Sequence, residues 1–110
     1  MDVPEIDVVE LAARREEGAP IIDVRRPAEY EEVRVAGAHL IPLAEVPERI
    51  DEVPTDATVY VICARSPRSA KAVEHYRAHG IDAVNVAGGT VAWIDAGLPV
   101  DRAGSEARGA

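Results

Sequence analysis

The stretch TVYVICARSPRS, residues 58–69, decides the fold prediction. Its first five residues are β-branched or aromatic, and such a nearly continuous apolar run is typical of a strand buried on both faces of a parallel sheet. Small, polar and basic residues follow. A helical pattern then begins at Ser69, with Ala70, Val73 and Tyr76 on one face. A strand, a short loop and a helix in this order indicate one unit of an α/β fold.

Similar units lie on both sides of this stretch. Further strands are predicted at residues 21–24, 39–41 and 83–86, and helices at residues 8–17, 27–30, 44–50, 69–79 and 90–96. Strands that alternate with helices predict a mostly parallel sheet. We expect one domain over residues 1–100, because its length is ordinary for a single core. Residues 101–110 are small or charged, and we expect them to form a flexible C-terminal tail.

The overall charge excludes some classes of partner. The chain has 12 Lys and Arg residues against 20 Asp and Glu residues, a formal net charge of −8 among 110 residues. Nucleic acids and acidic membrane surfaces attract clustered basic residues, so neither is an expected partner. No apolar run approaches the ~20 residues of a membrane-spanning helix. Residues 1–5 are acidic and do not resemble a signal peptide, so we expect a cytoplasmic location.

Cys63 is the main candidate for chemistry. It is the only cysteine in the sequence, which excludes an intrachain disulfide and a cysteine-based zinc site. It stands at the carboxyl end of the best strand and just before a helix, where backbone N–H groups and the helix dipole favour a thiolate. Arg65 and Arg68 add positive charge nearby. The alternative is that Cys63 is a small buried hydrophobic residue without chemistry.

Other residue types have simpler interpretations. Asp23 and Arg25 are interpreted as a structural ion pair or a capping pair rather than as an acid and a base. Trp93, alone on a predicted helix, is expected to pack into the core. His75 and His79 have a spacing that two metal ligands can use, but the sequence offers no third ligand, so no metal site is predicted.

Four segments in order carry a resemblance to a known family. They are residues 23–30 (DVRRPAEY), residues 36–43 (AGAHLIPL), the loop 63–69, and residues 86–100, which hold VAGG, Ala92-Trp93 and GLPV. Together they resemble the rhodanese-like family over nearly the whole chain. The resemblance implies a five-stranded parallel sheet with helices on both sides. Gly88 and Gly89 then form a turn that can border the active site.

The resemblance also implies a sulfurtransferase reaction. The Cys63 thiolate would take the outer sulfur of thiosulfate or of a persulfide donor, and would pass it as a persulfide to a thiol, to cyanide or to a protein acceptor. No cofactor and no metal are implied. The implied site consists of the catalytic Cys63, the substrate-binding Ala64, Arg65, Ser66, Arg68 and Ser69, and the supporting Asp23 and Arg25. Arg68, with Arg65 as a second candidate, would hold the anionic donor.

Two alternatives stay open. One is a module of the same fold that binds ligands or senses them without turnover. The other is a phosphatase or arsenate reductase of the same fold, whose cysteine loop is one residue longer. The shorter loop of this chain has four residues between Cys63 and Arg68, and favours a single sulfur over a tetrahedral oxyanion.

The chain departs from the family pattern at several positions. Ala64 and Ser66 replace the family's frequent Arg and Gly, and Arg34 stands where many members have a histidine. Pro67 has no N–H to offer to an anion, unless it simply occupies the first helical turn, where that N–H is not needed. The sequence therefore leaves open the donor, the acceptor, the pathway and the oligomeric state.

Overall fold

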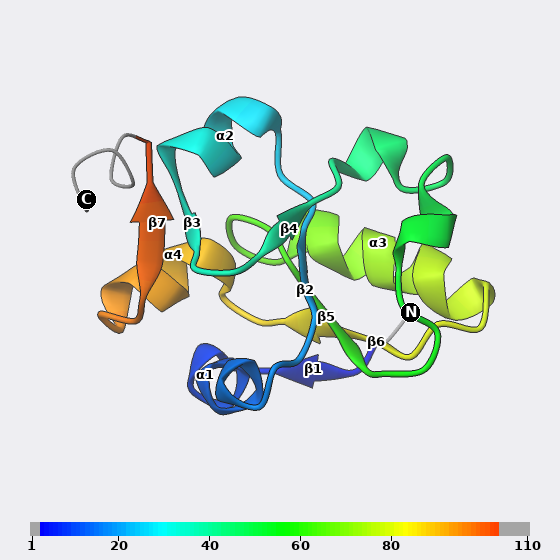
Figure 1. Ribbon diagram of the computed structural model, residues 1–110, viewed down its shortest axis with the longest axis horizontal. Helices are drawn as coiled ribbons and strands as arrows, with labels where there is room; N and C mark the ends of the chain where they lie inside the picture. Colours follow the sequence, from blue (N-terminus) through cyan, green and yellow to red (C-terminus); the bar gives the residue numbers. More distant parts are fainter. Residues whose placement is uncertain (1–2, 104–110) are drawn as a thin grey trace.

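The computed structural model describes residues 3–103 and contains a five-stranded, all-parallel sheet (Figure 1). The strand order is β1-β6-β5-β2-β4. The strands are β1 (Glu5–Ile6), β2 (Ile21–Asp23), β4 (His39–Leu40), β5 (Val59–Ile62) and β6 (Ala83–Val86). β5 lies in the middle and is buried along its whole length, as its apolar run predicts. The predicted five-stranded parallel sheet is confirmed.

Helices cover both faces of the sheet, which was also predicted. They are α1 (Val8–Glu16), α2 (Pro27–Glu32), α3 (Pro67–Ala78) and α4 (Gly89–Asp95). On one face, α3 buries Val73 and Tyr76 in a cluster with β5. On the other face, Leu11 of α1 and Trp93 of α4 share a second cluster. Trp93 is fully buried and its indole N–H donates to the Pro99 carbonyl oxygen at 2.7 Å, so its core position is confirmed.

A small antiparallel pair of strands was not predicted. β3 (Val33–Val35) pairs with β7 (Val100–Arg102), and Arg34 faces Asp101 in the register. The expectation that the tail begins at residue 101 is therefore wrong for Asp101 and Arg102, because β3 offers them a hydrogen-bonding edge. Residues 104–110 of the predicted tail lie outside the described residues.

The helix predicted over residues 44–50 is wrong. Two short 3₁₀ turns replace it, η1 (Leu43–Glu45) and η2 (Ile50–Glu52), each closed by a bond from the next valine back to the first residue of the turn. The physical reason is Pro47, which has no N–H for a continuous hydrogen-bond ladder. Within residues 3–103, no helix has the length and apolar character needed to span a membrane.

Candidate active site

Cys63 lies directly after β5, at the carboxyl edge of the sheet where parallel α/β sheets bind their ligands. A short loop joins it to α3. The helix begins at Pro67, two residues earlier than predicted, and Pro67 takes the first helical position. A proline there loses no helical hydrogen bond, since that N–H has no partner inside the helix.

The start of α4 fixes the carbonyl groups of the loop. The Cys63 carbonyl oxygen accepts bonds from the Thr90 backbone N–H at 2.8 Å and from the Thr90 hydroxyl at 3.0 Å. The Ala64 carbonyl oxygen accepts from the Val91 N–H at 3.0 Å. A Cβ atom on Gly89 would lie 2.5 Å from both carbonyl oxygens, and Gly89 has a φ of +60°. Only glycine permits this close approach, so the turn at Gly88–Gly89 packs directly on the loop.

This arrangement leaves backbone donors directed away from α4. In a trans peptide the N–H points opposite to the preceding carbonyl, so the Ala64 and Arg65 N–H groups point to the other side of the loop. Among residues 3–103, the N–H groups of Ala64, Arg65 and Ser66 have no hydrogen-bond acceptor, and neither do those of Arg68 and Ser69 in the first turn of α3. The loop can therefore supply several N–H groups to an anion.

The sulfur of Cys63 has an apolar side and a polar side. Cys63 is 0% exposed and belongs to the apolar cluster under α3, as the non-catalytic alternative expects. Its Sγ nevertheless lies 3.3 Å from the hydroxyl oxygen of Ser69, which is also buried. A purely hydrophobic cysteine does not require this contact. Because the thiol has no exposed surface, a donor molecule can reach Sγ only after part of its cover moves.

The two loop arginines differ in their surroundings. Arg68 donates to both carboxylate oxygens of Glu29, at 2.7 and 3.1 Å, and so links α3 to α2. The hydrogen bonds from Arg68, against some desolvation, lower the pKa of Glu29 to about 2. The bonds to Glu29 raise the pKa of Arg68 against desolvation, and the nearby Cys63 adds a smaller effect in the same direction.

Arg65 is exposed and has no ion-pair or hydrogen-bond partner within the described part of the chain. The charge of Arg68, the residue first expected to hold the donor, is thus already matched by a carboxylate. Arg65 is the loop cation whose charge is not matched by a carboxylate within residues 3–103.

Asp23 and Arg25 form the expected ion pair. Both are buried, and Arg25 Nη2 lies 2.8 Å from Asp23 Oδ2, with Nε 3.0 Å from Oδ1. Arg25 also donates to the Val33 carbonyl oxygen at 2.7 Å. Asp23 is aligned with Ile62, the residue before Cys63, so the pair joins this edge of the sheet to β3.

Three polar residues near the loop were not predicted from the sequence. Glu29 belongs to the motif of residues 23–30, but no role was predicted for it, because its partner Arg68 is 39 positions away. Asn85 accepts a bond from the Ser69 hydroxyl at 2.5 Å and donates to Glu5 at 2.9 Å. A signal for Asn85 was present, because it is a polar residue in the middle of an apolar strand. Glu5 gave no such signal.

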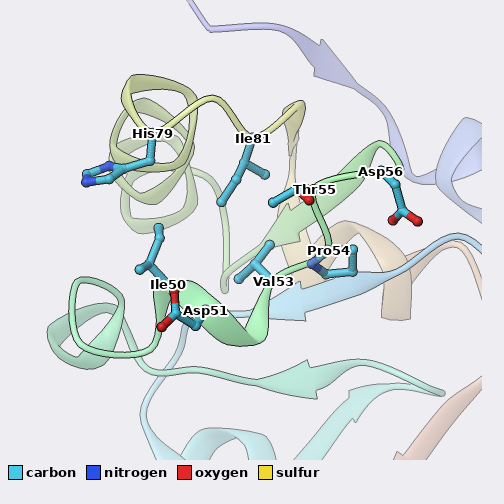
Figure 2. A pocket seen from close by; sticks show the side chains of 8 residues that line it. All are labelled: Ile50, Asp51, Val53, Pro54, Thr55, Asp56, His79 and Ile81. Carbon is cyan, nitrogen blue, oxygen red and sulfur yellow. The ribbon is translucent and has the colours of Figure 1, made fainter.

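A depression of about 570 Å³ opens at the opposite edge of the sheet (Figure 2). It is formed by segments that precede β5 and β6, and its lining residues are Ile50, Asp51, Val53, Pro54, Thr55, Asp56, His79 and Ile81. His79 stacks on His75 at 4.5 Å between ring centroids. No group of three metal-ligating side chains occurs in residues 3–103. No cysteine lines the depression.

Comparison with known proteins gives a consistent result. A family model described as "Rhodanese-like domain" matches residues 7–96. A protein of Allochromatium vinosum named "Sulfurtransferase" is 34% identical over 101 residues, which cover 89% of this chain and 94% of that protein. The uncharacterized protein YqhL of Bacillus subtilis is 40% identical over 76 residues, covering 68% of this chain and 60% of YqhL. The crystal structure of a rhodanese-related protein from Thermoplasma volcanium superposes with a TM-score of 0.83 at 34% identity, covering 89% of this chain and 97% of that one.

Proposed function

Since the chain belongs to the rhodanese-like family, we propose that it transfers sulfane sulfur through a persulfide on Cys63. A sulfurtransferase or sulfur-carrier role is the function that the family and the named relatives support. The proposal adds the donor, which is thiosulfate or a persulfide, and the acceptor, which is a thiol, cyanide or a protein thiol. A cytoplasmic location remains a prediction, which cell fractionation tests.

The reaction consists of two displacements at sulfur. The Cys63 thiolate attacks the outer sulfur of thiosulfate, an S–S bond forms, and the bond to the sulfonate sulfur breaks with release of sulfite. The electron pair leaves with sulfite, and the total charge is unchanged. The acceptor thiolate then attacks the outer sulfur of the persulfide and restores the Cys63 thiolate. Covalent catalysis of this kind divides one transfer into two easier steps.

The observation that carries the proposal is the set of backbone N–H groups that follow Cys63 in the chain and have no acceptor within residues 3–103. They belong to Ala64, Arg65 and Ser66 in the loop and to Arg68 and Ser69 in the first turn of α3. Such donors stabilise an anionic sulfur, whether it is a thiolate or a persulfide. The short spacing of four residues between Cys63 and Arg68 supports a small anion rather than a phosphate.

The other site residues have roles that follow from their contacts. Arg65 would attract the anionic donor, because it is exposed and unpaired in the described part of the chain. Arg68 would bind the donor only after it leaves Glu29. The buried pair of Asp23 and Arg25 would keep the loop in place from β2 without touching the donor.

Intact mass measurement tests the proposal. Incubation with thiosulfate should add the mass of one sulfur atom, cyanide should remove it as thiocyanate, and Cys63→Ser should show no adduct. Arg65→Ala should slow the formation of the adduct, whereas Arg14→Ala, on the exposed face of α1, is the control for loss of one positive charge. A protein that forms neither adduct nor thiocyanate is not a sulfurtransferase for this donor.

A binding module without turnover is the second candidate. The observation that favours it is the closed state of the site, with Cys63 fully buried and Arg68 already paired with Glu29. In that case thiosulfate or sulfite would bind without forming a mass adduct. Release of phosphate from an aryl phosphate, lost in Cys63→Ser, would instead indicate a phosphatase.

A further inference from the structure

A line of three polar side chains connects the edge of the sheet to the Cys63 sulfur. Glu5 on β1 accepts a bond from the Asn85 Nδ2 group at 2.9 Å. The Oδ1 atom of Asn85, on β6, lies 2.5 Å from the Ser69 hydroxyl oxygen, which is 3.3 Å from Sγ. Asn85 and Ser69 are fully buried, while Glu5 is exposed. The line therefore reaches from solvent to the reactive atom.

The chemistry of these groups fixes the direction of the first two hydrogen bonds in the line, from Asn85 to Glu5 and from Ser69 to Asn85. An ionised carboxylate only accepts, so Asn85 must turn its NH₂ group toward Glu5 and its oxygen toward Ser69. Ser69 has one hydroxyl proton. Its hydroxyl oxygen lies 2.5 Å from the Asn85 oxygen and 3.0 Å from the Ser66 carbonyl oxygen, and both distances are shorter than the 3.3 Å to the sulfur. Ser69 then presents a lone pair to Cys63, which favours an S–H group that donates over a thiolate that accepts.

We propose that Glu5 and Asn85 are positioning residues that turn the Ser69 hydroxyl away from Cys63 and so reduce its thiolate fraction. Without the Glu5 carboxylate, Asn85 can rotate and donate to Ser69, and the hydroxyl proton is then shared between the Cys63 sulfur and the Ser66 carbonyl oxygen. The effect on the rate of sulfur transfer rests on the proposed function. The effect on ionisation does not, and it is measurable in the absence of any sulfur donor.

Other charged groups also face the loop. They are Asp23 and Arg25 from β2, Glu29 from α2, Arg68 from α3, and Arg65 of the loop itself. The first turn of α4, which packs on the loop, carries no charged residue. None of these groups changes when Glu5 is replaced. A difference in titration between Glu5→Gln and the unmodified protein therefore has two sources only, the line of polar side chains and the loss of one distant charge.

Ultraviolet absorbance of the thiolate provides the measurement, because the chain has one cysteine and Cys63→Ser supplies the tyrosine background. Glu5→Gln should move the pH at which half of the absorbance has appeared down by about one unit, the effect of one hydrogen bond to a charged group. Because Glu5 is exposed on a two-residue edge strand, the thermal melting of this variant should match that of the unmodified protein.

A double-mutant cycle separates the proposed line from a simple charge effect. In a Ser69→Ala background, Glu5→Gln should leave the titration unchanged, because the hydroxyl that it redirects is missing. Asn85→Leu should reproduce the shift of Glu5→Gln. Adding Glu5→Gln to Asn85→Leu should then cause no further shift. If Glu5→Gln causes no shift, or if its shift persists in Ser69→Ala or Asn85→Leu, the proposal is overturned.

Discussion

Replacing Glu29 by glutamine should strengthen the binding of an anionic sulfur donor. The guanidinium of Arg68 holds both Glu29 oxygens, at 2.7 and 3.1 Å, in the geometry that an oxyanion donor would use. In the proposed function, Glu29 and the donor would therefore compete for this guanidinium. Glutamine keeps the shape of the side chain but removes its charge, so Arg68 becomes available to the donor.

The size of the effect follows from the ion pair. Arg68 lowers the pKa of Glu29 from 4.5 to about 2, which corresponds to about 3 kcal/mol before screening by water. Each side chain keeps about a third of its surface exposed, 33% for Arg68 and 31% for Glu29. Screening then leaves about 1–2 kcal/mol. If the donor no longer has to displace a charged competitor, its affinity should rise about 5- to 30-fold.

Steady-state transfer from thiosulfate to cyanide measures this gain. In Glu29→Gln the KM for thiosulfate should fall about tenfold with little change in kcat, because the competition affects ground-state and transition-state binding alike. Glu31→Gln, on the exposed side of the same helix, is the control for net charge. Adding Arg68→Ala to Glu29→Gln should abolish the gain. An unchanged KM in Glu29→Gln, or an equal fall in Glu31→Gln, would refute the competition.

Three further predictions concern stability, measured by urea or thermal unfolding. Gly89→Ala should lose about 2–4 kcal/mol, because its φ is +60° and the new Cβ would lie 2.5 Å from the Cys63 carbonyl oxygen. Gly18→Ala, also at positive φ but with no atom within 4 Å, should lose only about 1–2 kcal/mol, and equal losses would contradict the collision. Tyr76→Phe should gain up to about 1 kcal/mol, since the buried hydroxyl has no partner among the described residues; a loss would show that the hydroxyl is bonded. Because the folded pKa of Glu29 is depressed, its stabilising contribution is complete above pH 4.5 and is lost as the pH falls through about 2. The difference in stability between the unmodified protein and Glu29→Gln should therefore shrink as the pH falls from 4.5 to about 2. A difference that stays constant would exclude the ion pair as its source.

The sequence predicted the elements whose signal is local. The apolar run at residues 58–62 and the periodic residues 69–79 correspond to β5 and α3, since a fully buried strand and an amphipathic helix leave clear patterns. β3 and β7 are three-residue strands that form only by pairing with each other, although they lie far apart in the sequence. Neither segment is long enough to show an alternating apolar pattern. The helix prediction over residues 44–50 did not take Pro47 into account, and the missing N–H of this residue decided the structure.

In the site, too, local features could be predicted from the sequence and contacts between distant residues could not. The position of Cys63 after a strand and before a helix, and the ion pair of Asp23 with Arg25, follow from neighbours in the sequence. The partner of Arg68 could not be read in this way, because Glu29 is brought to it only when α2 and α3 meet at the loop. The sequence showed a positive loop, whereas the fold neutralises one of its two arginines.

The surroundings of the sulfur act on it in opposite directions. In the proposed arrangement, backbone N–H groups at the start of α3 would stabilise an anionic sulfur, whereas the Ser69 hydroxyl, directed by Asn85, would oppose it. A persulfide changes this relation, because its outer sulfur carries the charge and lies one bond farther from Ser69, while the inner sulfur is no longer ionised. The Ser69 hydroxyl then lies next to an uncharged sulfur and no longer destabilises an anion, and the N–H groups can stabilise the charged outer sulfur. If the proposed persulfide forms, this arrangement should favour the loaded state over the free thiolate, as a protein that holds sulfur until an acceptor arrives would require.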